Sequence, residues 1–72
     1  MNTDEFSRQL GAGLRAVRMQ RRLTLREAAE KFPGGLKYST LLSYERGYRG
    51  IPIERFAELA AFYGVPAAVL IP

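Results

Sequence analysis

The side chains of this 72-residue sequence with the strongest chemical character are its 11 basic ones, nine of which are arginines. A guanidinium stays protonated at physiological pH and presents a planar fork of N–H donors, which suits phosphate groups and the acceptor edge of guanine. Seven acidic residues leave a formal net charge of +4. A basic surplus of this kind is expected of a chain that binds nucleic acid, although proteins without anionic ligands show it as well.

Residues for covalent and metal chemistry are scarce in this chain. It has no cysteine and no histidine, so it offers neither thiolate nor imidazole as a nucleophile, a general base or a metal ligand. Glu27 and Glu30 are three residues apart, which is usual for surface charge on a helix. We therefore expect no enzyme, no metal and no cofactor. No apolar run approaches the roughly 18 residues of a membrane span, so we expect no membrane partner either.

The elements that carry these side chains are predicted to be helices, because apolar residues recur at intervals of three and four. The first helix begins near Asn2 or Thr3, and Asn2 with Glu5 has the spacing of a capping box. One face of this helix carries Phe6, Leu10, Leu14 and Val17. We expect that face to lie against the core.

A second capping box, formed by Thr24 and Glu27, opens a short helix from about Leu25 to Phe32. Its inward-facing residues are Leu25, Ala28, Ala29 and Phe32. The Pro-Gly-Gly segment at 33–35 ends this helix, because proline cannot continue it and glycine frees the backbone. The small pair of alanines allows a neighbouring helix to cross closely.

Three further helices complete the prediction of an all-α, five-helix orthogonal bundle. The third begins at residue 37 or 38 and runs to 46, and Gly47 is its C-cap. The fourth spans about 52–63, with proline at its first position and Gly64 as its cap, and the last spans 66–70. The core-facing residues of the third helix and its approach are Leu36, Leu41 and Tyr44, and those of the fourth are Ile53, Phe56, Ala57, Leu59, Ala60 and Tyr63.

The segment from Leu23 to Gly47 has the organisation of a helix-turn-helix, namely a capped short helix, a tight turn and a second short helix. The runs LTLREAAEK at 23–31, STLLSYERG at 39–47, FAELA at 56–60 and YGVP at 63–66 resemble the phage-repressor type of helix-turn-helix, the Cro/C1 or XRE family. Within that family, SYERG and FYGVP are particularly similar to the BldD-like developmental regulators of actinobacteria. The turn at 32–37 is longer than is usual for the family, and Lys37 stands where a serine or threonine usually caps the second helix.

This resemblance, which covers about residues 10–70, implies a lambda-repressor-like DNA-binding domain. Its recognition helix, about 38–46, would enter the major groove. The base-contacting residues implied are Tyr38, Ser39, Leu42 and Ser43. Because this set lacks Arg, Asn and Gln, we expect modest intrinsic specificity or a contribution from DNA shape. The phosphate-contacting residues implied are Thr24, Lys37, Arg46, Tyr48 and Arg49.

Glu45 has a structural role by the same resemblance, in which it forms an ion pair with Arg18 of the first helix. A carboxylate on a DNA-facing element is repelled by phosphates, and a partly buried charge is normally paired. We therefore expect the Arg18–Glu45 pair to hold the recognition helix on the first helix.

Several of these side chains have a second interpretation. Arg8, Arg15 and Arg22 are typical of a solvated helix face. Tyr38 and Tyr48 can contact phosphates or pack against protein, and Leu42 can belong to the groove, the core edge or a protein interface. Residues 69–71 form an apolar end that can serve as a partner surface.

Two functions follow, of which the first is sequence-specific binding of double-stranded DNA as a transcriptional regulator, a repressor in particular. It would bind a pseudo-palindromic operator as a homodimer, one copy per half-site, and be monomeric or weakly dimeric alone. Its location would be the cytoplasm, at the bacterial nucleoid. Residues 1–72 would be one domain, which could be the N-terminal part of a longer regulator. A phage-type repressor or an antitoxin is also compatible with this resemblance. The alternative function is a protein-interaction module on a repressor-like fold.

Overall fold

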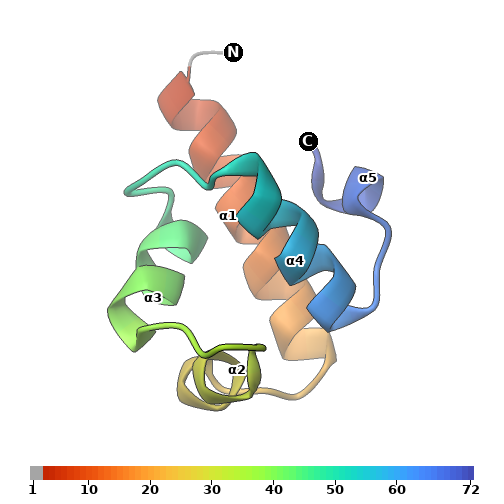
Figure 1. The fold of residues 1–72 in the computed structure, drawn as a ribbon. Coiled ribbons are helices and arrows are strands. Elements are labelled where there is room, and N and C mark those ends of the chain that lie inside the picture. Colours follow the sequence, from red (N-terminus) through yellow and green to blue (C-terminus); the bar gives the residue numbers. More distant parts are fainter. Residues whose placement is uncertain (1–2) are drawn as a thin grey trace.

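The computed structural model describes residues 3–72, in which five helices and no strand are arranged around one core (Figure 1). The helices are α1 (Thr3–Gln20), α2 (Leu25–Lys31), α3 (Tyr38–Arg46), α4 (Ile53–Tyr63) and α5 (Ala67–Leu70). The longest helix, α1, packs most extensively against α3, while α2 lies at the end where α1 terminates. The predicted all-α bundle is confirmed. None of the helices in this part of the chain is long and apolar enough to cross a membrane.

The core draws one face from each of the first four helices and is completed by the end of α5. Leu14, Leu41 and Leu59, from α1, α3 and α4, are almost completely buried. The other buried apolar residues are Leu10, Val17, Ala28, Ala29, Phe32, Tyr44, Phe56, Ala60, Tyr63 and Leu70. Burial of this apolar surface is the main favourable contribution to folding. Most of the predicted core is therefore confirmed.

Three residues predicted to face the core lie at the surface instead. The side chain of Phe6 is 40% exposed, because the first turns of α1 extend past the ends of the other helices (Figure 1). Ile53 is 79% exposed and Ala57 is also exposed. Both lie at the edge of the apolar stripe of α4, since each successive residue turns by about 100° around a helix. Leu25 is half-buried against the core rather than inside it.

Three predicted helix boundaries shift by one residue. Phe32 is the C-cap of α2, while Pro52 and Pro66 are the N-caps of α4 and α5, and all three have extended ψ angles of 134°, 142° and 139°. Phe32 precedes a proline, which disfavours the helical conformation in the residue before it. Asn2, half of the first predicted capping box, lies outside the described residues.

The helices α1, α3 and α4 end in the same backbone motif. Arg22, Gly47 and Gly64 adopt left-handed conformations, with φ angles of 58°, 70° and 73°. In each case the next residue donates its N–H to the carbonyl five positions earlier, as in a Schellman motif. The predicted C-caps at Gly47 and Gly64 are confirmed.

The backbones of α1 and α3 approach each other closely at two glycines. A Cβ atom on Gly11 would collide with the carbonyl oxygens of Tyr44 and Glu45. A Cβ atom on Gly47 would lie 2.7 Å from the backbone N and Cα of Arg8. These glycines let α1 hold α3 in one position, which determines how the exposed face of α3 is presented.

Candidate nucleic-acid interface

The helices α2 and α3 pack against each other and are joined by the turn at residues 32–37. Within this turn the N–H of Gly35 donates to the carbonyl of Phe32 at 2.6 Å, and the N–H of Leu36 donates to that of Ala29 at 2.9 Å. Gly34 and Gly35 have φ angles of 81° and 76° with no atom near their missing Cβ positions. The turn thus requires glycine for its backbone conformation, and α2, turn and α3 form a helix-turn-helix.

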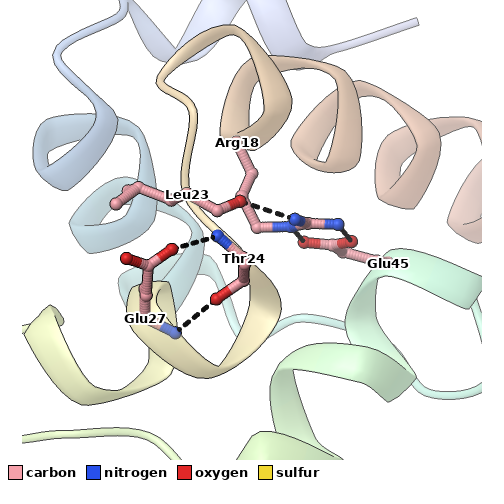
Figure 2. Close-up of polar contacts among 5 residues, drawn as sticks. All are labelled: Arg18, Leu23, Thr24, Glu27 and Glu45. Atoms are coloured by element: carbon pink, nitrogen blue, oxygen red, sulfur yellow. Dashed lines mark hydrogen bonds and ion pairs between the residues drawn. The ribbon is translucent and has the colours of Figure 1, made fainter.

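The predicted capping box at the start of α2 is confirmed (Figure 2). Thr24 Oγ1 accepts from the N–H of Glu27 at 3.1 Å, and Glu27 Oε1 accepts from the N–H of Thr24 at 2.9 Å. The hydrogen bond that the Glu27 carboxyl accepts from the Thr24 backbone N–H, and secondly its interaction with the Thr24 side chain, hold the pKa of this carboxyl below its ordinary value of 4.5. The capping box therefore fixes the start of α2 by a charge-dependent contact.

The lowered pKa of Glu27 predicts a pH dependence of stability. The ionised carboxylate favours the folded state, so its contribution is present above pH 4.5 and is lost as the pH falls through the folded-state pKa. Glu27→Gln keeps a side-chain acceptor for the Thr24 N–H but does not titrate. We expect acidification below pH 4.5 to lower the urea midpoint of the wild type more than that of Glu27→Gln.

The matched control for this experiment is Glu30→Gln, which removes an exposed carboxylate of α2 outside the capping box. It should keep the acid sensitivity of the wild type. Equal acid sensitivity of Glu27→Gln and the wild type would contradict the assigned role of Glu27.

The ion pair expected between Arg18 and Glu45 is present and joins α1 to α3 (Figure 2). Arg18 Nε donates to Glu45 Oε2 at 2.7 Å and Nη2 donates to Oε1 at 3.0 Å, which is a bidentate arrangement. The third nitrogen, Nη1, donates to the carbonyl of Leu23 at 2.7 Å. The two side chains are only 10% and 2% exposed. The hydrogen bond with Glu45 raises the pKa of Arg18, so its guanidinium stays protonated.

The C-terminal end of α1 is also tied to α4. Arg21 Nε donates to the carbonyl of Tyr63, the last residue of α4, at 2.8 Å. The hydroxyl of Tyr63 is buried without a hydrogen-bond partner among the described residues, and burial raises its pKa to about 12. Tyr63 is therefore neutral at physiological pH and belongs to the core, as its helical spacing predicts.

The four residues predicted to contact bases lie along one side of α3, next to its buried face. Tyr38 and Ser39 are exposed in the first turn, and Leu42 and Ser43 follow them at intervals of four, half-buried. The adjoining face of α3 carries Leu41, Tyr44 and Glu45, all buried. The structure thus gathers the predicted set on one surface.

The five residues predicted to contact phosphates lie at the ends of α2 and α3. Thr24 is the N-cap of α2, and Lys37 is the N-cap of α3 without a side-chain capping hydrogen bond. Arg46 is in the last turn of α3, and Tyr48 and Arg49 are exposed in the loop that follows. The guanidinium of Arg49 lies 5.7 Å from the centroid of the Tyr44 ring, which fixes it beside the end of α3. Positive charge therefore flanks α3 at both ends.

Two arginines at this surface were not among the predicted contacts. Arg15 and Arg26 line an open pocket of about 570 Å³, together with Arg18, Met19, Thr24, Leu25 and Tyr38. The Arg26 Cζ atom lies 5.3 Å from the centroid of the Tyr38 ring. Arg26 follows the predicted N-cap Thr24 by two residues, so the sequence places it in the first turn of α2. Spacing along the chain does not show that this position lies against α3.

A protein-family model matches most of this chain. The model described as "Helix-turn-helix" (HTH_3) covers residues 14–70. Among curated proteins, the chain is 38% identical over 58 residues to the cryptic phage CTXphi transcriptional repressor RstR of Vibrio cholerae. That match covers 81% of this chain and 50% of the repressor, so the chain spans about half the length of this relative.

Two solved structures are similar over nearly the whole chain. The crystal structure of the DNA-binding domain of BldD is 49% identical, with a TM-score of 0.90, and the match covers 100% of both chains. The S. venezulae BldD DNA-binding domain is 50% identical, with a TM-score of 0.87, over 94% of this chain and 99% of that one. The similarity extends over all five helices within residues 3–72, the turn at 32–37 included.

Proposed function

This chain belongs to the helix-turn-helix family, and we propose that it is a DNA-binding domain of a transcriptional regulator whose α3 enters the major groove. The observation that carries this proposal is the way α3 is held: a buried bidentate ion pair joins it to α1, while Tyr38 and Ser39 in its first turn remain exposed. A helix held in this way can present the same side chains to successive base pairs. RstR is named a transcriptional repressor, and we propose repression for this chain as well.

We propose that the exposed side of α3 reads bases and that the ends of the helix-turn-helix hold phosphates. Tyr38, Ser39, Leu42 and Ser43 would meet base edges, where serine hydroxyls act as donors or acceptors and Leu42 contacts a thymine methyl. Thr24, Lys37, Arg46, Tyr48 and Arg49 would contact the backbone on both sides of the groove. Their placement at both ends of α3 supports this division of roles.

We further propose that two copies bind a pseudo-palindromic operator, one on each half-site about one helical turn apart. Free chains would be monomers or weak dimers, so DNA would bring the two copies together. A regulator of this kind acts on the chromosome, and we place it in the bacterial cytoplasm, at the nucleoid.

Salt-dependent titration tests the proposed function. The domain is titrated onto a duplex selected from a randomised library and onto a scrambled duplex, at several salt concentrations. We expect binding to the selected duplex to be tighter by about 1000-fold. Arg46→Ala should lower the slope of log affinity against log salt by about one unit, because one phosphate contact is lost.

The matched control is Lys31→Ala, which removes one positive charge at the far end of α2 and should leave the salt slope unchanged. A steep slope without sequence preference would contradict sequence-specific recognition by this domain. Absence of binding to either duplex at low salt would contradict the proposal and favour the protein-interaction function. In that case Leu42 would contribute more to partner binding than the basic side chains.

A further inference from the structure

We propose that Arg26 reads a guanine in the major groove and that the ring of Tyr38 positions it, an inference that rests on the proposed function. Arg26 is the second residue of α2, and Tyr38 is the first residue of α3. The two come together across the turn, with the Arg26 Cζ atom 5.3 Å from the Tyr38 ring centroid. Such a cation–π contact attracts the guanidinium to the ring face.

This contact holds Arg26 without using its N–H donors. Among residues 3–72, the Arg26 side chain makes no hydrogen bond and no ion pair, and its recorded contact is the one with the Tyr38 ring. Arg18, which lines the same pocket, uses its Nε, Nη1 and Nη2 atoms within the protein. Arg26 is therefore positioned while its five donors remain available to a ligand.

The surroundings of Arg26 fit the edge of a base pair. The open pocket of about 570 Å³ that it lines lies between the last turns of α1 and the starts of α2 and α3. Tyr38 belongs to the N-terminal turn of α3, which is the part of a recognition helix that meets base edges. The residues of α3 that we propose to face bases include no Arg, Asn or Gln. Arg26 supplies a side chain that can recognise one base specifically, because two guanidinium N–H groups match the O6 and N7 acceptors of guanine.

Selection from a duplex library with randomised base pairs tests the role of Arg26. The wild type should prefer guanine at one position of each half-site by about tenfold or more. Arg26→Ala should lose that preference and keep those at the other positions. Lys31→Ala, with the same change of charge in the same helix, should keep all of them. Thermal unfolding should be unchanged in Arg26→Ala, because its side chain is exposed.

Two variants of Tyr38 test the positioning role. Tyr38→Phe keeps a ring face beneath the guanidinium, whereas Tyr38→Leu removes it. We expect the guanine preference at the Arg26 position to be retained in Tyr38→Phe and lost in Tyr38→Leu. Loss in both variants would assign the preference to the tyrosine hydroxyl and overturn the positioning role.

Two results would overturn the proposal for Arg26. If Arg26→Ala weakened binding to all sequences equally and lowered the salt slope by about one unit, Arg26 would contact a phosphate. If the wild type had sequence preferences that Arg26→Ala kept in full, the inference alone would fail. A wild type without any sequence preference would instead refute the proposed function, and this inference with it.

Discussion

Glu45→Ala is expected to lower the free energy of unfolding by about 3 kcal/mol or more, because it leaves the charge of Arg18 buried without its partner. The two side chains are 10% and 2% exposed, so water cannot replace the lost carboxylate without rearrangement. For a domain of this size the Tm should fall by more than about 12 °C. Calorimetry or thermal circular dichroism measures this change directly.

The exposed ion pair between Arg55 and Glu58 provides the control. Its atoms are 3.9 Å apart and its side chains are 34% and 59% exposed. Glu58→Ala should therefore change stability by less than about 1 kcal/mol. If Glu45→Ala does not fold, Glu45→Gln preserves the shape of the side chain and should give an intermediate loss. A Tm for Glu45→Ala equal to that of Glu58→Ala would contradict the structural importance of the buried pair.

The same substitution connects stability to the proposed DNA binding. Glu45 is 6% exposed and its carboxylate is held by Arg18, so it is not placed to touch DNA. Its loss should nevertheless weaken specific binding, because α3 is then no longer held to α1 by the ion pair. A folded Glu45 variant with unchanged specific binding would show that the helical packing alone orients α3.

Features that depend on neighbouring residues were predictable from sequence. The Thr24–Glu27 capping box and the caps at Gly47 and Gly64 involve atoms within five residues of one another, so residue type and spacing determine them. Apolar periodicity likewise identified most of the buried face of each helix. It failed at Phe6, because periodicity shows which side of a helix is apolar but not how far the neighbouring helices extend along it. It failed at Ile53 because this residue lies at the edge of the apolar stripe, where periodicity does not separate buried from exposed positions.

Contacts between residues far apart in the sequence could not be predicted from local patterns alone. The pairing of Arg18 with Glu45, 27 positions apart, was inferred from a family resemblance and from the cost of an unpaired carboxylate. The contact between Arg26 and Tyr38 was missed, because the turn at 32–37 determines how the start of α2 faces the start of α3. A glycine such as Gly11 within a helix is compatible with close packing, but its partner, the backbone of α3, was not identified, because it depends on the packing of α1 against α3.

Gly47→Ala is expected to be the other strongly destabilising change, with a loss of about 2–5 kcal/mol in the free energy of unfolding. Its φ angle of 70° costs any L-residue about 1–2 kcal/mol. In addition, the new Cβ would lie 2.7 Å from the backbone of Arg8 in α1, and a contact with backbone cannot be relieved by a rotamer change. The helices α1 and α3 would have to separate, which adds about 1–3 kcal/mol of packing strain.

Gly64→Ala separates these two contributions, because Gly64 ends α4 in the same motif with a φ angle of 73° and no atom near its missing Cβ. It should lose only the conformational part, about 1–2 kcal/mol. Arg22 shows that this chain accommodates a non-glycine residue in that conformation, with a φ angle of 58°. The excess loss in Gly47→Ala, measured by urea denaturation of both variants, is then the cost of moving α3 from α1. Equal losses in the two variants would mean that the α1–α3 contact yields freely, and that α3 is not rigidly positioned by α1.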